Sequence, residues 1–379
     1  MKNEKIRVLQ VNASNFGKGG ISTTIFRLMQ EINDNNIVFS FLTDKEVPEE
    51  YLREIKEKRG TIEKIPDMSL KKNKNWLKYK YLRDVLKKNK YDIVHINGDN
   101  ALALSPYIFA AKLMKDCKIV VHAHTTGFGE GNAFARRIKE NVNNLFRGWI
   151  LSGIDLKIAC CHEAANFMFP RQEIKNVHIM KNGLIPQKYE FVQEKRDALR
   201  DEMGVNDKIV VGHIGRFSYA KNHKFLIELF HYMKNENKDV ELWLIGDGED
   251  EDSIRNQVHE KGLEKNIRFL GVINNVQDYL CGMDIMVFPS RYEGLPLVLV
   301  EAQTNDLPIV CSDVISKDTF FNDKVVSCSL YEPYSKWIKV INKSLGKKRR
   351  KMTDETKRAG FDMNDIANKV KELYYSVLN

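Results

Sequence analysis

Residues 285–301 read IMVFPSRYEGLPLVLVE: a short apolar strand, a loop, and a second apolar run that suits a helix. Pro296 marks the expected start of the helix, because its fixed φ fits a first helical turn, where its missing N–H is not needed. Glu293 then falls on the loop and Glu301 inside the helix. This strand–loop–helix unit recurs along the chain, and its repetition decides the fold.

Short apolar strands alternate with helical stretches throughout the 379 residues. The first half has strand candidates at 6–11, 38–42, 93–96, 119–122, 156–159 and 177–180. The second half has them at 209–214, 241–245, 267–269, 285–288 and 309–311. Near-continuous apolar strands separated by helices predict parallel sheets covered on both faces. The sequence therefore predicts an α/β protein with two doubly wound, Rossmann-like domains that face each other across a cleft.

The break between the two series falls near the turn at 181–186 and the charged helical stretch at 194–203. We expect an N-terminal domain over 1–190, a C-terminal domain over 191–361 and a final helical segment over 362–379. Composition agrees with a globular protein, since 43% of the residues are hydrophobic and 29% are charged. No run of roughly 18 apolar residues is present to span a membrane. The six cysteines lack a C-x-x-C pair or zinc spacing, which favours buried, reduced thiols in a cytoplasmic protein.

The net charge of +9 is unevenly distributed. Residues 71–90 hold nine Lys and Arg against one Asp, with aromatic and aliphatic residues between them. This pattern predicts a basic amphipathic helix in peripheral contact with an anionic membrane surface. A solvated, lysine-rich face explains it equally well. No nucleic-acid-binding module accompanies the charge, so nucleic acid is not an expected partner.

Candidate binding residues follow the strands, where ligands bind in open α/β sheets. Arg216 and Lys221 lie on one such loop and suit a diphosphate, although both could be ordinary surface cations. Glu293 and Glu301 flank a helix N-terminus, where a phosphate fits and carboxylates can accept hydrogen bonds from sugar hydroxyls. A buried helix with a capping acid is the structural alternative.

Other loops carry weaker signals. His124 follows the strand at 119–122 and suits hydrogen bonding to a substrate hydroxyl, whereas His122, on the same side, is expected to be structural. The two histidines could together bind a metal ion, but the sequence shows no evident third ligand. Glycines at 17–20 allow close approach of a ligand, or form a plain strand–helix turn. The D-x-D at 250–252 is read as acids in a first helical turn.

Together these motifs resemble the family-4 glycosyltransferases of the GT-B fold, and the resemblance covers essentially the whole chain. The motifs that carry it are, in chain order, Gly17–Gly20, His124, Asn182-Gly183, Gly215-Arg216 with Lys221, Gly246-Asp247-Gly248, Glu293 and Glu301. One departure is Ser218-Tyr219-Ala220, which stands where the family more often has a proline-acid run before the lysine.

The resemblance implies a catalytic set of Glu293, His124, Arg216 and Lys221. Arg216 and Lys221 would bind the donor diphosphate, Glu293 the donor sugar and Glu301 the ribose diol. His124 would face the transferred sugar.

The resemblance also implies further contacts to the donor. Gly19 and Gly20 would lie beside the phosphates, and the backbone near Val272 and Ile273 would meet the base. The start of the helix would complete the site with Gly294, Leu295, Leu297 and Val298. The final helix would pack back on the N-terminal domain.

The implied reaction moves a sugar from a nucleotide-diphospho-sugar, with a UDP-sugar expected, to a glycan or polyprenyl-linked acceptor in capsule or exopolysaccharide synthesis. The family generally retains the anomeric configuration and needs no metal, so no cofactor is expected. Two other functions remain open on the same fold: a sugar-nucleotide epimerase, and a non-catalytic protein that binds a sugar nucleotide.

Overall fold

The structure, a computed structural model, describes residues 5–12, 20–68, 72–127, 133–236 and 239–379. The chain forms two compact units. The first comprises Met1–Gly183 together with Met363–Asn379, and the second comprises Leu184–Asp362.

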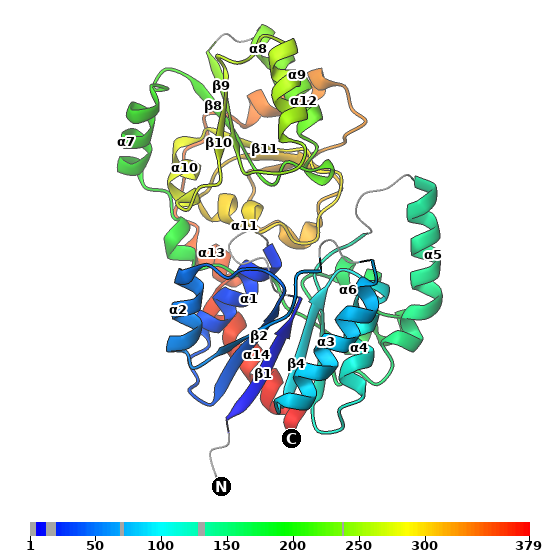
Figure 1. Cartoon of the computed structure of the whole chain (residues 1–379). Helices are drawn as coiled ribbons and strands as arrows, with labels where there is room; N and C mark the ends of the chain where they lie inside the picture. The colour runs from blue at the N-terminus through cyan, green and yellow to red at the C-terminus, as the bar shows by residue number, and fades with distance from the viewer. Residues whose placement is uncertain (1–4, 13–19, 69–71, 128–132, 237–238) are drawn as a thin grey trace. The chain divides into compact units, whose positions relative to one another are not determined.

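The first unit is built on a seven-stranded parallel sheet with the order β3-β2-β1-β4-β5-β6-β7 (Figure 1). Its strands are β1 (Ile6–Val11), β2 (Ile37–Thr43), β3 (Thr61–Lys64), β4 (Ile93–Gly98), β5 (Lys118–Ala123), β6 (Leu156–Ala159) and β7 (Val177–Ile179). Its helices are α1 (Gly20–Glu31), α2 (Glu49–Glu57), α3 (Lys74–Lys88), α4 (Ala101–Lys112), α5 (Ala133–Ile150), α6 (His162–Met168) and α14 (Met363–Leu378).

Helices cover both faces of this sheet. Met29 of α1 and Val370 and Tyr374 of α14 pack with Val8 and Ile93 of the central strands in one buried core. Figure 1 shows α3 and α4 on the opposite side of the sheet from α14. The last helix of the chain therefore completes the core of the first unit.

The second unit is built on a six-stranded parallel sheet with the order β10-β9-β8-β11-β12-β13. Its strands are β8 (Ile209–Ile214), β9 (Val240–Ile245), β10 (Ile267–Gly271), β11 (Ile285–Phe288), β12 (Ile309–Ser312) and β13 (Val325–Cys328). Its helices are α7 (Gln193–Met203), α8 (His223–Glu236), α9 (Glu251–Glu260), α10 (Val276–Gly282), α11 (Leu297–Thr304), α12 (Tyr334–Ser344) and α13 (Thr353–Arg358).

The strand order reverses once in each sheet, between β1 and β4 in the first and between β8 and β11 in the second. At such a reversal, the loops that leave the carboxyl ends of the two neighbouring strands diverge to opposite faces, which leaves room for a ligand between them. The loops after β8 and β11 are thus where the fold of the second unit places a binding site, whereas residues 13–19 after β1 lie outside the described residues.

The predicted fold of two doubly wound parallel sheets is confirmed, and the helix at 363–378 belongs to the first unit as expected. The boundary lies after Gly183 and not after residue 190. The reason is that Leu184 pairs with Asp362, and Tyr189 bonds to Glu301, both within the second unit. None of the described helices is long and apolar enough to cross a membrane.

Candidate functional site

Two loops meet at the switch point of the second sheet. Asn222, which ends the loop after β8 in a left-handed conformation (φ 58°), donates its side-chain amide to the Pro289 carbonyl at 3.1 Å. The Arg291 guanidinium in turn donates to the Asn222 side-chain oxygen at 2.7 Å, and the Arg291 backbone N–H donates to the Ala220 carbonyl at 2.7 Å. These bonds fix the loop after β8 against the loop after β11.

Lys221 and Glu293 form an ion pair across this junction. The Lys221 ammonium lies 2.6 Å from the Glu293 carboxylate, and the side chains are 17% and 13% exposed. Lys221 also sits 4.6 Å from the centre of the Phe288 ring. The structure thus brings together two of the predicted catalytic residues, one cation and one anion, on either side of the switch point.

Arg216 lies on the same loop as Lys221 but bonds elsewhere. Its guanidinium lies 2.9 Å from Glu249, on the loop after β9, and both side chains are largely exposed. The two loops touch closely, because a Cβ at Gly246 (φ 136°) would lie only 2.2 Å from the Gly215 carbonyl oxygen. The two predicted cations therefore lie on one loop but pair with acids of two different loops, Arg216 with Glu249 and Lys221 with Glu293.

The start of α11 lies directly after Glu293. Pro296 occupies the N-cap position, so the helix begins at Leu297, one residue later than predicted. Gly294 and Leu295 form the end of the loop, and Val298 lies in the first turn. First-turn amides have no partner within their helix, and they carry the positive end of the helix dipole. An anion beside Lys221 would therefore also be stabilised by this helix end.

Glu301 is buried within α11 and accepts a hydrogen bond from the Tyr189 hydroxyl at 2.9 Å. Asn305, one turn later, donates to the Tyr189 carbonyl at 3.0 Å. Tyr189 is a partner that the sequence did not reveal, because it lies before the expected domain boundary.

The remaining predicted donor contacts are spread over other loops. Val272 and Ile273 follow β10 at the same sheet edge, with Val272 exposed. In the first unit, Gly20 opens α1, whereas Gly19 lies outside the described residues.

Two buried histidines near Lys221 were not predicted. His213 in β8 contacts the Val287 carbonyl through Nδ1 at 2.9 Å, and its ring centre lies 4.7 Å from that of His223. Burial lowers the pKa of His213 to about 4 and that of His223 to about 2, and the Lys221 charge acts in the same direction. Both rings are therefore neutral at pH 7, and they pack as aromatic groups beneath the ion pair.

His124 lies at the carboxyl edge of the first sheet, after β5. It is buried, its ring centre is 4.0 Å from that of His122, and burial lowers its pKa to about 3. Its Nε2 lies 3.2 Å from the Asn97 side-chain oxygen. The alternation of the strand correctly predicted that both rings share one side.

The His124 contact continues into a buried polar network. Asn97 donates to Gln10 at 3.0 Å, Gln10 donates to the Tyr374 hydroxyl at 3.2 Å, and that hydroxyl lies 2.7 Å from Nδ1 of His95. Sequence reasoning missed these four residues. The available signal was the polar residues within two largely buried strands, Gln10 in β1 and His95 and Asn97 in β4.

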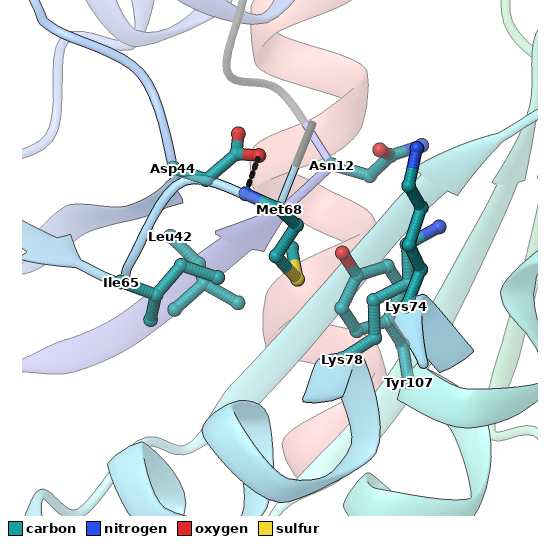
Figure 2. Close-up of a pocket in the computed structure, with 8 residues that line it drawn as sticks. All are labelled: Asn12, Leu42, Asp44, Ile65, Met68, Lys74, Lys78 and Tyr107. Atoms are coloured by element: carbon teal, nitrogen blue, oxygen red, sulfur yellow. Dashed lines mark hydrogen bonds between the residues drawn. The ribbon is translucent and has the colours of Figure 1, made fainter. Parts of the chain in front are cut away.

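A pocket of about 170 Å³ opens beside the carboxyl ends of β1, β2 and β3. Figure 2 shows Lys74, Lys78 and Tyr107 on one side of it, with Leu42 and Ile65 on the other. Its remaining lining residues are Asn12, Asp44 and Met68. Burial lowers the pKa of Lys78, and the charge of nearby Lys74 acts in the same direction while Asp44 opposes it. This side of the predicted basic helix faces a pocket.

The described part of the chain contains no cluster of three or more His, Cys, Asp or Glu side chains arranged to hold a metal ion. The expectation of a metal-free reaction stays a prediction.

Two family models match the chain. Residues 18–188 match the model described as Glycosyltransferase Family 4, and residues 195–359 match the model described as Glycosyl transferases group 1. Each match covers nearly all of one half.

Curated relatives agree with these matches. EpsF of Bacillus subtilis, named as a glycosyltransferase, is 28% identical over 99% of this chain and 97% of its own length. The capsular polysaccharide biosynthesis glycosyltransferase CapH of Staphylococcus aureus is 31% identical over 43% of this chain and 47% of its own. An Escherichia coli UDP-Gal:alpha-D-GlcNAc-diphosphoundecaprenol alpha-1,3-galactosyltransferase is 26% identical over 62% and 60%.

Among solved structures, Anabaena HepE in complex with UDP and glucose superposes with a TM-score of 0.73. It covers 98% of this chain and 100% of HepE at 17% identity, a likeness that shows the shared fold.

Proposed function

The chain belongs to the family-4 glycosyltransferases of the GT-B fold, and from this premise we propose that it transfers a sugar from a nucleotide-diphospho-sugar to a lipid-linked glycan. The observation that carries the donor half of this proposal is the Lys221–Glu293 pair, held at the switch point of the second sheet beside the start of α11. A cation and a helix N-terminus in one place suit a diphosphate, and a neighbouring carboxylate suits a sugar hydroxyl.

In this reaction the bond between the sugar C1 and the diphosphate oxygen breaks, and the acceptor hydroxyl oxygen bonds to C1 while its proton passes to the departing diphosphate. Negative charge grows on the departing diphosphate, where Lys221, Arg216 and the first turn of α11 would stabilise it. Glu293 would hold the sugar in place. Retention of configuration and a UDP donor are proposed by analogy with the family.

The acceptor is proposed to be a polyprenyl-linked glycan in capsule or exopolysaccharide synthesis, handled at the cytoplasmic face of the membrane. The E. coli relative is named for a diphosphoundecaprenol acceptor and the S. aureus relative for capsule synthesis. The pocket beside Lys74 and Lys78 supports an acceptor that carries a negatively charged group, since a half-buried lysine is stabilised by an anion.

Product analysis with a panel of labelled nucleotide sugars tests the proposal. Transfer of label to a lipid-linked acceptor is expected. An isomerised donor without transfer would show an epimerase. Donor binding without turnover across the acceptor panel would show a binding protein.

A further inference from the structure

One helix of the first unit exposes an apolar stripe. Of the thirteen large hydrophobic side chains that are exposed in the described part of the chain, six lie on α5. They are Phe134, Ile138, Val142, Leu145, Phe146 and Trp149. At about 100° per residue these six fall within an arc of roughly 120°, so they form one continuous face. Single exposed apolar residues are ordinary, but a contiguous stripe of this kind marks a contact surface.

The stripe faces outward because the other side of α5 is anchored. Asn143, which is buried, accepts a hydrogen bond from the Leu102 backbone N–H at 3.3 Å. The Arg147 guanidinium donates to the carbonyls of Asn166 and Phe167 at 2.8 and 2.9 Å. These contacts attach the polar side of the helix to the unit and leave Phe134 and Leu145 each 75% exposed.

The charge around the stripe is basic. Lys139 and Arg137 lie on either side of the stripe, whereas Arg136 lies nearer the anchored side, and Glu140 is the single acid of α5. Aromatic and aliphatic residues on one face, with Lys and Arg beside them, are the features of helices that lie in the headgroup region of a bilayer. A protein partner would not require this basic border.

We propose that α5 binds the surface of an anionic membrane, with its apolar stripe inserted among the lipid headgroups. The sequence placed a membrane contact at residues 71–90 instead. In the structure α3 buries Leu82 and Leu86 and leaves only Trp76 as a large exposed apolar residue, so α3 offers mainly charge. The inference goes beyond the proposed transfer reaction, because it holds whatever sugar is moved.

Vesicle flotation of the full chain tests the proposal. Wild-type protein is expected to float with vesicles of phosphatidylcholine and phosphatidylglycerol, less so at high salt. The triple variant Phe134→Ser/Leu145→Ser/Trp149→Ser is expected to remain in the aqueous fraction. A matched control, Tyr232→Ser/Val314→Ser/Tyr331→Ser, removes three exposed apolar residues of the second unit and is expected to float like the wild type.

Two outcomes would overturn the proposal: a wild-type chain that ignores anionic vesicles, or equal flotation of the α5 variant. Sedimentation without lipid tests the other possible occupant of the stripe, a second copy of this chain. If the wild type is a dimer, the α5 variant is a monomer and neither floats, the stripe binds a second copy.

A separate observation concerns His124. The Asn97 amide nitrogen faces two backbone carbonyls, those of Val11 at 3.2 Å and His95 at 3.3 Å, which can only accept hydrogen bonds. The amide orientation is thereby fixed, and the oxygen of Asn97 faces Nε2 of His124. Since an oxygen must receive a proton there, His124 carries its hydrogen on Nε2.

The donor and acceptor roles are fixed in the same way along the network as far as Tyr374 in α14. Gln10 accepts from Asn97 through its oxygen, so its nitrogen donates to the Tyr374 hydroxyl. The hydroxyl proton is then directed to Nδ1 of His95. Every bond in the chain points in one direction, from His124 to His95. Nδ1 of His124 is left as a buried acceptor with no partner among the described residues.

We infer that Asn97, Gln10 and Tyr374 are positioning residues, which hold His124 as a neutral acceptor whose Nδ1 receives a hydrogen bond from a substrate hydroxyl. This inference rests on the proposed function.

Two substitutions of His124 distinguish the roles of its nitrogens. The amide of glutamine reaches the position of Nε2 and can keep the bond to Asn97, whereas the oxygen of asparagine lies near the position of Nδ1. His124→Gln is expected to fold normally and lose about 10²-fold in kcat, as for other lost transition-state contacts. His124→Asn is expected to be the more active of the two. A purely structural His124 would give the reverse order and overturn the inference.

Tyr374→Phe tests the far end of the network, with Tyr375→Phe as its matched control. Tyr374→Phe removes the hydroxyl that contacts Gln10 and His95, and Tyr375→Phe removes a hydroxyl that bonds to Asp34 at 2.9 Å and lies outside the network. A several-fold fall in kcat at unchanged donor KM is expected for Tyr374→Phe alone, and equal turnover of the two variants would refute the positioning role.

Nitrogen NMR of histidine-labelled protein gives a readout that needs no activity. Wild-type His124 is expected to show a protonated Nε2 and an unprotonated Nδ1 at pH 7. A proton on Nδ1 would overturn the inference even if the transfer reaction is confirmed. If the wild type transfers no sugar, the proposed function is wrong, but the tautomer measurement is unaffected.

Discussion

Among single residues, Lys221 and Glu293 matter most to the proposed donor site. They come from loops 72 positions apart, and each neutralises the other in a largely buried setting. Lys221→Ala removes the cation from the departing diphosphate and is expected to lower kcat by about 10²-fold or more. Steady-state kinetics measure this, and a near-normal kcat would exclude Lys221 from the donor site.

Glu293→Gln keeps the size of the side chain but removes its charge. We expect transfer to be abolished while the protein still binds nucleotide, because Lys221 then becomes available to phosphate. The transfer assay measures the loss of activity, and calorimetric titration with UDP measures the retained nucleotide binding. Ordinary turnover of the variant would show that Glu293 takes no part in the reaction.

The buried histidines predict how stability depends on pH. Burial lowers the pKa to about 3 for His95 and His124 and to about 4 for His213, below the value of about 6.5 in an unfolded chain. The unfolded state therefore binds more protons between these values, so the free energy of unfolding falls as pH drops below about 6.5. Urea unfolding at pH 7.5, 6 and 5 should show this loss, and constant stability down to pH 5 would contradict the burial of neutral rings.

Sequence alone placed the residues that follow strands, because Arg216, Lys221, Glu293 and His124 stand next to turn signals. It could not place their partners. Asn97, Gln10 and Tyr374 meet only after β1, β4 and α14 have assembled, and Gln10 and Tyr374 are 364 positions apart in the sequence. A polar residue inside an apolar strand gives no sign of which distant side chain will satisfy it.

Among the helices and strands, α3 shows that lysines of one basic helix lie in different environments. Lys78 faces the pocket at the carboxyl edge of the sheet, whereas Lys87 lies exposed in the last turn of the same helix. Lys78→Ala is expected to raise the KM for an anionic acceptor several-fold and leave the donor KM unchanged. Lys87→Ala removes the same charge and serves as the control. Identical effects of the two substitutions would show that Lys78 acts through the general positive charge of the surface and not through the pocket.

Elements that carry a continuous apolar run were predicted well, and so were the edge strands β7 and β10, whereas the edge strands β3 and β13 were missed. The strand β3 (Thr61–Lys64) has a single apolar residue, and in β13 (Val325–Cys328) the polar Ser327 follows two valines. Neither strand shows the uninterrupted apolar run of a central strand, and both are mostly exposed or half-buried. The stripe on α5 escaped notice for the opposite reason. Apolar residues at helical spacing normally mean a buried face, and only the structure shows that this one is exposed.

At the scale of the whole molecule, the first unit is assembled from both ends of the chain. Val370 and Tyr374 of α14 are fully buried in its core, and α14 packs on α1. Deleting residues 363–379 is expected to unfold the first unit and leave the second folded, because no strand of the second sheet is lost. Hydrogen exchange would show this as lost protection confined to the first sheet; intact protection there would mean that α14 is dispensable.

We expect the donor diphosphate to bind between the loops after β8 and β11, and a crystal structure of the protein with a bound UDP-sugar would test this expectation. We expect the diphosphate beside Lys221 and the first turn of α11, with the sugar in contact with Glu293. A diphosphate bound in the first unit would contradict the proposed donor site. So would a structure in which Lys221 stays paired to Glu293 and makes no contact to phosphate.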